Sequence, residues 1–202
     1  DLAAVMAARA GARTVLIERY GFLGGMAVSG EVHPFMGNHV DGVPLDGPVY
    51  TEWVAAMDKY RASAGNSLFI SKDAAMLAAE DLCLAAGVNL LFHHQLADVL
   101  LEDRRINGLV LLSKSGYTAA RGAVYVDCTG DADLAFRAGC TCEQGGPSGH
   151  CQPMTLCFKL SNVDRGNMPA RDQINLLYDE ARARGEINCL REDILLFHWF
   201  ED

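Results

Sequence analysis

The sequence predicts a mixed α/β fold, in which a parallel sheet carries an antiparallel β-meander and is followed by the start of a second, α+β domain. Three observations predict this architecture. Residues 2–19 read as a helix, a glycine turn and a short apolar strand. Residues 88–130 contain apolar stretches separated by turn dipeptides. The composition changes near residue 140, where loop-like sequence replaces the apolar runs.

The first observation predicts half of a βαβ unit. Residues 2–10, rich in Ala and Met, predict a helix that ends at Gly11, because glycine readily adopts the left-handed conformation found after helices. The β-branched apolar run at 13–19 then predicts a strand buried on both faces. The partner strand of this unit is expected upstream of residue 1.

The next segments predict a loop and two helices. Residues 21–46 are rich in glycine and lack a sustained period, which predicts a long functional loop. A helix is expected from Pro48 to about Ala64, since proline is tolerated in the first turn. A second helix is expected after Ser71, which can cap it, with Gly87 at its end.

The meander follows. We expect a parallel strand after Gly87, hairpin turns at Asn107-Gly108 and Ser115-Gly116, and a returning strand at residues 123–130. A short helix is predicted between Gly130 and Gly139. In the second domain, residues 154–161 alternate as a half-buried strand would, and residues 170–185 predict an amphipathic helix.

Composition excludes several classes of protein. The 202 residues carry a formal net charge of -9, which argues against a nucleic-acid partner, because nucleic-acid binding normally needs a basic face. The apolar stretch at 2–8 is far shorter than the roughly 20 residues that span a bilayer. Seven cysteines without framework spacing favour reduced thiols and a cytoplasmic location. A small-molecule substrate is expected, and the sequence leaves an oligomer open.

Glu18 stands at the carboxyl end of the predicted strand at 13–19. In dinucleotide-binding folds a carboxylate at this place accepts hydrogen bonds from the ribose hydroxyls of an adenosine. The glycine loop of that motif should lie about 20 residues earlier, just before Asp1. A solvated strand end is the competing interpretation of Glu18.

Two glycine-containing edges strengthen the dinucleotide interpretation. Gly24 and Gly25 allow the backbone to lie against a ligand, because glycine has no Cβ. Thr129, Gly130 and Asp131 come directly after a predicted strand, at the expected carboxyl edge of the same sheet. Two such edges favour an extended ligand between them.

The chain resembles the FAD-dependent oxidoreductases of the two-dinucleotide-binding-domain superfamily. The resemblance lies in "ARAGARTVLIERYGFLGGMAVSG", "VHPFMG", "VDCTGDADLAFRAG" and "CQPMTLCFKL". It implies a Rossmann-like FAD/NAD(P)-binding domain at 1–139, incomplete at its N-terminus and with an insertion at about 21–70. It also implies an incomplete substrate or cap domain at 140–202.

The resemblance also implies FAD as the cofactor and assigns residues to it. Glu18 would bind the adenosine ribose, with Arg19 beside it, and the backbone near Leu96 would meet the adenine. Gly24, Gly25 and Met26 would pass along the pyrophosphate, ribityl chain and flavin. Thr129, Gly130 and Asp131 match the second cofactor-contacting motif. The first glycine loop and the later glycine-acid segment of the family pattern are absent from these residues.

Other functions remain as alternatives. An NAD-dependent dehydrogenase would use Glu18 in the same way, and a binding module could keep the fold without catalysis. Cys140, Cys142, His150 and Cys151 could be offered as zinc ligands, but their spacing favours no metal.

Single histidines and cysteines do not identify a catalytic group. His33 could move a proton near the flavin, although a packing role is favoured. His93 and His94 are interpreted as structural or solvent-facing, and Cys128 as a small core residue. The sequence therefore predicts no catalytic residue.

Overall fold

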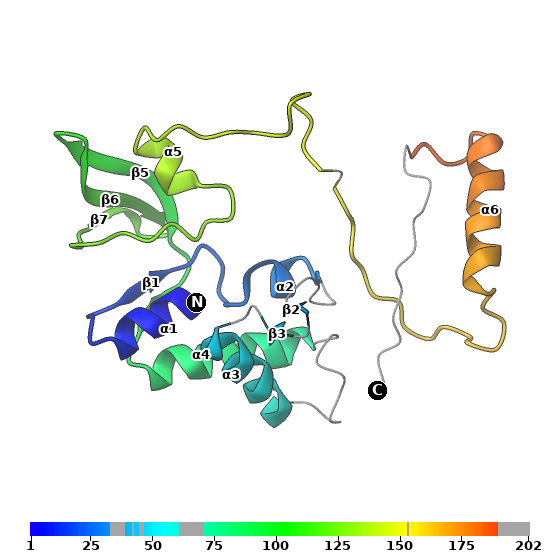
Figure 1. Cartoon of the computed structure of the whole chain (residues 1–202), viewed down its shortest axis with the longest axis horizontal. Coiled ribbons are helices and arrows are strands. Elements are labelled where there is room, and N and C mark those ends of the chain that lie inside the picture. The colour runs from blue at the N-terminus through cyan, green and yellow to red at the C-terminus, as the bar shows by residue number, and fades with distance from the viewer. Residues whose placement is uncertain (33–38, 42, 45–46, 61–70, 153, 190–202) are drawn as a thin grey trace. The chain divides into compact units, whose positions relative to one another are not determined.

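The computed structural model of the chain describes residues 1–32, 39–41, 43–44, 47–60, 71–152 and 154–189 (Figure 1). By contacts between Cα atoms it divides into two compact units, Asp1–Cys157 and Phe158–Asp202. Its helices and strands are, in order, α1 (Leu2–Arg9), β1 (Val15–Ile17), α2 (Gly25–Ser29), β2 (His39–Val40), β3 (Val43–Pro44), α3 (Pro48–Met57), the 3-10 helix η1 (Asp58–Tyr60), α4 (Lys72–Ala85), β4 (Asn89–Leu91), β5 (Gln95–Glu102), β6 (Arg105–Ser113), β7 (Gly116–Ala120), α5 (Asp133–Arg137) and α6 (Arg171–Ala183).

The first unit has two hydrophobic clusters. The helix-side cluster gathers buried residues of α1 to α4 and their flanks, namely Val5, Leu23, Ala27, Val28, Val49, Trp53, Met57, Ala74, Ala75, Ala78, Ala79, Cys83 and Val88. The sheet-side cluster consists of Val99, Leu109, Leu111 and Leu134. Small alanines on α4 allow α1, α2 and α3 to pack closely around it, which explains why an alanine-rich helix lies at the centre of this core.

The parallel pair β1 and β4 separates the two clusters. Leu16 lies opposite Leu90, and Ile17 lies opposite Leu91. Leu16 and Leu90 pack on the helix-side cluster, whereas Ile17 and Leu91 pack on the sheet-side cluster. Successive side chains of a strand point to opposite faces, so one short apolar strand serves both cores. The predicted parallel strand is thereby confirmed (Figure 1), but it is only partly buried: Leu16 and Ile17 are half-buried, and Val15 is exposed.

Helix boundaries in the first unit follow the predicted caps. Gly11, with φ +91°, follows α1, and Gly87, with φ +78°, follows α4. The Ser71 hydroxyl accepts a hydrogen bond from the Ala74 amide at 3.5 Å, as its predicted capping role requires. The helix from Pro48 ends earlier than expected, since α3 stops at Met57 and η1 continues to Tyr60. Residues 61–64 lie outside the described residues.

The prediction of an unstructured loop at 21–46 was wrong in part. This segment contains α2, and β2 pairs with β3 in a two-residue antiparallel ladder. Leu23 and Val28 are buried in the helix-side cluster. The apolar side chains between the glycines therefore anchor the segment in the core. This contact was not predicted, because these side chains do not recur with a helical or strand period.

The meander is confirmed, but its first turn is not where the sequence placed it. β5, β6 and β7 form an antiparallel sheet in that order. The turn between β5 and β6 lies at Asp103-Arg104, with φ of +47° and +63°. Gly108 instead pairs with Leu100 inside β6, and Asn107 lies at a register irregularity. Asn-Gly serves here as a bulge in a strand, because glycine tolerates the local distortion as well as it tolerates a turn.

Two predicted strands are absent. Residues 123–128 and 154–160 form no strand in the described part of the chain. Val124 and Val126 are 79% and 65% exposed, and Met154 is 99% exposed. Cys128, predicted to be a core residue, is exposed as well. No strand among the described residues pairs with these segments, and an alternating pattern without a partner gains no ladder hydrogen bonds.

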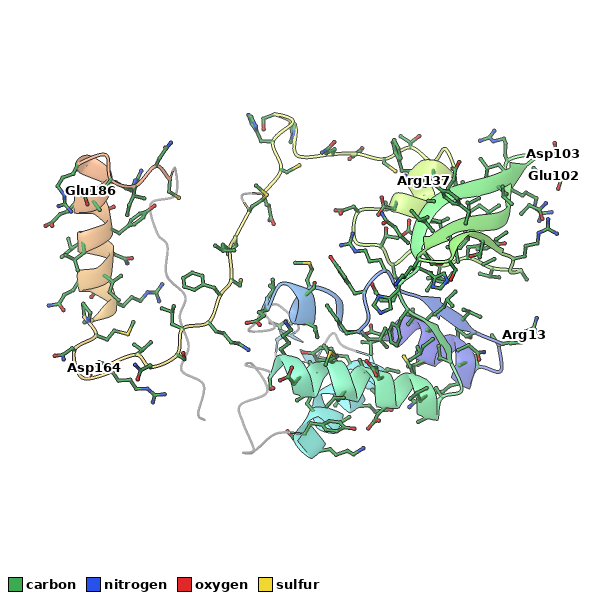
Figure 2. All side chains as sticks on the ribbon, turned by 180° about the vertical axis from the view of Figure 1, so that it is seen from behind. Arg13, Glu102, Asp103, Arg137, Asp164 and Glu186 are labelled. Carbon is green, nitrogen blue, oxygen red and sulfur yellow. The ribbon has the colours of Figure 1, made fainter. Side chains whose placement is uncertain are left out.

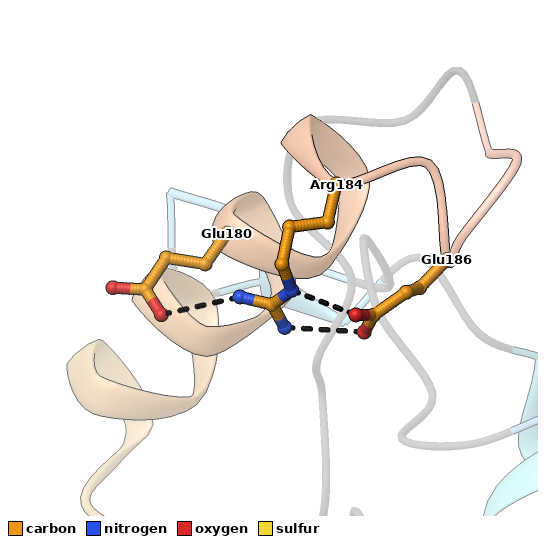
Figure 3. A network of polar contacts seen from close by, with 3 residues as sticks. All are labelled: Glu180, Arg184 and Glu186. Carbon is orange, nitrogen blue, oxygen red and sulfur yellow. Dashed lines mark hydrogen bonds and ion pairs between the residues drawn. The ribbon is translucent and has the colours of Figure 1, made fainter.

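The second unit contains the predicted amphipathic helix α6. The Arg184 guanidinium lies between two carboxylates, 3.7 Å from Glu180 and 2.7 Å from Glu186 (Figure 3). The hydrogen bond from Arg184 lowers the pKa of Glu186. Tyr178, on the same helix, is buried. Charged groups thus line a solvent-facing part of this helix, as the sequence predicts.

Candidate functional site

Glu18 is fixed by its own backbone and by its neighbour. Its amide donates to the Leu91 carbonyl at 3.0 Å, and its carbonyl accepts from the His94 amide at 3.0 Å. One carboxylate oxygen accepts from the Tyr20 amide at 2.8 Å. The side chain is half-buried directly after β1. The carboxylate is therefore held in one orientation, with its second oxygen available as an acceptor.

Arg19 contacts the ring that follows it. Its guanidinium carbon lies 4.7 Å from the centroid of the Tyr20 ring. Tyr20 in turn stacks on Phe22, with 5.2 Å between centroids and an interplanar angle of 3°. The turn after β1 is therefore stiffened by a cation–π contact and an aromatic pair, which lie next to Glu18.

The glycines of α2 have different environments. At Gly24, with φ +107°, an added Cβ would lie 2.2 Å from Val28 Cγ2, so this glycine is required by packing inside the protein. At Gly25, with φ +55°, nothing lies within 4 Å of an added Cβ. Met26 is 64% exposed beside it. Of the two glycines, only Gly25 leaves open space against the backbone.

The second edge is organised by Asp127, which the sequence reasoning missed. One oxygen of its carboxylate accepts from the Thr129 amide at 3.0 Å and from the Thr129 hydroxyl at 2.8 Å. The other oxygen accepts from the Ala135 amide at 2.9 Å. The Thr129 hydroxyl accepts from the Asp133 amide at 2.8 Å. The signal in the sequence was an aspartate two residues before a threonine, a spacing typical of local side-chain caps.

These hydrogen bonds perturb the Asp127 carboxyl group. Burial by itself would raise the pKa of Asp127, but the hydrogen bonds from Thr129 and Ala135 outweigh it, so its pKa is lowered. The hydrogen bonds to the ionised Asp127 carboxylate hold the turn in place. Thr129, Gly130 and Asp131 are exposed on this turn. Gly130 has φ +93° and nothing within 4 Å of an added Cβ. This turn therefore also presents open backbone.

The sheet-side cluster links several predicted site residues. Ile17, which precedes Glu18, packs on this cluster, and so do Leu96 and Tyr125. Leu96 also pairs with Leu111, and a register irregularity follows it. The Arg137 side chain donates through Nε to the Ala97 carbonyl at 3.1 Å and so joins α5 to β5 (Figure 2). Ile17 and Leu96 thus pack on the cluster to which Leu134, just after the 129–131 turn, belongs. Gly24 instead caps α2, which begins at Gly25 and packs on the helix-side cluster.

Other predicted groups are placed as follows. His33 lies outside the described residues. His94 Nδ1 lies 2.6 Å from the Phe92 carbonyl, a local structural contact. In the described part of the chain, no group of three or more His, Cys, Asp or Glu side chains is arranged to hold a metal ion. Burial raises the pKa of the Cys83 thiol, and the other six cysteines are exposed. None of the seven cysteines, all of which are described, forms a disulfide.

One cavity in the described part of the chain lies away from these residues. A shallow apolar depression of about 240 Å³ lies between α1 and the first turn of α3, lined by Leu2, Met6 and Tyr50 among others. It includes none of the predicted cofactor residues. Among the described residues, no helix is long and apolar enough to span a bilayer.

A comparison with family models decides the family. A model described as FAD dependent oxidoreductase matches residues 2–196. The chain belongs to this family. FAD is accordingly its cofactor, and a general role in flavin redox chemistry follows. No curated protein matches the chain. The family does not favour the NAD-dependent dehydrogenase or the non-catalytic module.

The chemistry of the described residues is compatible with FAD. The ribose needs an acceptor carboxylate, and Glu18 has one oxygen held and a second available. Close approach of backbone to a ligand needs positions without a Cβ in open space, and Gly25 and Gly130 provide them. Gly24 does not, because Val28 fills the space that its missing Cβ leaves.

Proposed function

We propose that this chain belongs to an FAD-dependent oxidoreductase that carries out flavin-mediated redox chemistry on a small molecule, and that its first unit binds the FAD. The observation that carries the proposal is the Glu18 carboxylate, oriented by the Tyr20 amide at the carboxyl end of a parallel strand. When bound, FAD supplies the electron-transferring group, and the protein supplies binding and orientation. A Rossmann-like arrangement of the first unit is part of this proposal.

The residues have separate roles in the proposal. Glu18 accepts hydrogen bonds from the ribose hydroxyls, and Arg19 lies next to it on the Tyr20 ring. The backbone of Leu96 lies along the adenine. Gly25 and Met26 follow the pyrophosphate and the ribityl chain, while Gly24 maintains the turn that presents them.

The second edge completes the proposed site. Thr129, Gly130 and Asp131 contact the cofactor from the turn that Asp127 holds. Asp127 itself has both carboxylate oxygens occupied by internal hydrogen bonds, so it positions the turn and does not bind the ligand.

The second domain is also proposed, as residues 140–202. The separate compact unit Phe158–Asp202, with α6, supports a second body in this part of the chain. We propose that it begins the domain that recognises the substrate. Screening small molecules for bleaching of the bound flavin would identify the substrate class. The cytoplasmic location stays a prediction.

The test is the affinity of the full-length protein for FAD. The wild-type protein should bind FAD with a yellow visible spectrum. Glu18→Ala removes charge-assisted hydrogen bonds, each worth about 1.5 to 3 kcal/mol, and should weaken binding about tenfold or more. Glu143→Ala, at an exposed loop position, is the matched control and should bind normally. A colourless wild-type protein that takes up no FAD, or a Glu18→Ala variant with normal affinity, would overturn the proposal.

A further inference from the structure

The turn that carries Glu18 is hydrogen-bonded to the residues that connect β4 to β5. The His93 amide donates to the Tyr20 carbonyl at 3.2 Å, and the next amide, that of His94, donates to the Glu18 carbonyl at 3.0 Å. Residues 18–20 are thus held by residues 93–94 beyond the last parallel pair of β1 and β4, in an order opposite to that of the parallel ladder. The backbone of His93 turns back at this point, with φ +56°.

The His93 ring covers Gly21. A Cβ added to Gly21 would lie 2.7 Å from His93 Cε1 and 2.9 Å from Nε2. The imidazole therefore occupies the space that the missing side chain of Gly21 leaves. A left-handed φ is uncommon for a residue other than glycine and costs of order 1–3 kcal/mol unless the surroundings impose it. Here the hydrogen bond to Tyr20 and the contact with Gly21 impose it together.

This contact bears on the proposed ligand group. The Tyr20 amide, which orients the Glu18 carboxylate at 2.8 Å, belongs to the peptide unit that precedes Tyr20 in the same turn. His93 restrains the carbonyl on the other side of Tyr20 and packs on the residue after it. Movement of the turn would release the carboxylate, because no other hydrogen bond to this side chain is present among the described residues.

We propose that His93 is a positioning residue that fixes the Glu18 carboxylate for the adenosine ribose, and thereby selects flavins that carry an adenosine. This inference rests on the proposed function of Glu18. His93 acts through Gly21 and Tyr20 and does not need to touch the ligand. Replacing His93 should therefore weaken the binding of FAD, which contains the ribose of an adenosine. The binding of FMN, which lacks that ribose, should not change.

Two variants remove the contact from opposite sides. His93→Asn deletes the ring and keeps a residue type that tolerates φ > 0. Gly21→Ala adds a Cβ that must displace the far end of the imidazole. Each should raise the dissociation constant for FAD about 3- to 10-fold, the range expected when one hydrogen bond between the Glu18 carboxylate and the ribose is lost. The double variant should be no weaker than the worse single variant, because both changes break the same contact.

A second measurement does not depend on bound FAD. In the ligand-free full chain, hydrogen exchange at the Tyr20 amide should become about tenfold faster in His93→Asn. The amide of Cys83, in the buried helix α4, should be unchanged and reports that the fold is intact.

The outcomes separate the two proposals. Normal Tyr20 exchange in His93→Asn, additive effects of the two substitutions, or an equal loss of FMN binding would each overturn the role of His93. Normal FAD binding by Glu18→Ala would overturn the proposed function instead. In that case faster Tyr20 exchange in His93→Asn would still establish that His93 holds the turn.

Discussion

Replacing Asp127 with alanine should remove the hydrogen bonds that hold the turn at residues 129–131 and so destabilise the protein. The Asp127 carboxylate accepts three hydrogen bonds, two from Thr129 at 3.0 and 2.8 Å and one from Ala135 at 2.9 Å. A hydrogen bond to a charged group contributes about 1.5 to 3 kcal/mol when buried, and solvent reduces this at a half-buried site. Taking about 1 kcal/mol for each bond, Asp127→Ala should lower the free energy of unfolding by about 2 to 3 kcal/mol.

The stabilisation by Asp127 should depend on pH. The pKa of Asp127 is lowered in the folded protein, so the folded state favours the ionised carboxyl group. The stabilisation is therefore fully present above the ordinary aspartate pKa of about 4, and it is lost as the pH falls through the lowered value. Wild type and Asp127→Ala should differ most at neutral pH, and the difference should shrink in acid below about pH 4.

Urea unfolding of the full chain at neutral and acid pH measures both quantities. Asp131→Asn is the matched control, since it removes a charge from the same turn at an exposed position. Its free energy of unfolding should change by less than about 0.5 kcal/mol. The reasoning is refuted if Asp127→Ala is as stable as wild type, or if its deficit is the same at both pH values.

Four further substitutions test local packing and backbone strain. Gly24→Ala places a Cβ 2.2 Å from Val28 Cγ2 at φ +107° and should lower the free energy of unfolding by about 2 to 4 kcal/mol, measured by urea unfolding. Gly25→Ala, in open space, should lower it by about 1 kcal/mol. Equal losses would contradict the packing role of Gly24. Arg104→Gly relieves φ +63° in the β5–β6 turn and should raise stability by about 0.5 to 1 kcal/mol, so an unchanged melting temperature would count against it. Trp53→Phe loses the 2.9 Å bond from Nε1 to a carbonyl of α4 and should cost about 1 to 2 kcal/mol, and a neutral result would show that this bond contributes nothing.

The candidate site was only partly predictable from the sequence. The placement of Glu18 directly after a parallel strand was predictable, since the apolar run at 15–17 and the charge that follows it are local in the sequence. The role of His93 was not, because the hydrogen bond from its amide to the Tyr20 carbonyl joins residues more than 70 positions apart. Gly24 was predicted as a ligand-facing glycine, whereas its contact with Val28 gives it a packing role as well.

Helices and strands differed in how well their sequences specified them. The sequence alone determined α1, α4 and α6, because a helix satisfies its backbone hydrogen bonds within one segment and its ends are marked by nearby residues such as Ser71 and Gly87. It also determined the family, through ordered motifs along most of the chain. Only the tertiary structure decided which alternating segments become strands. β5 and β6 pair, while residues 123–128 and 154–160 do not, because the hydrogen bonds of a strand belong to its neighbour and no neighbour is present beside those segments among the described residues.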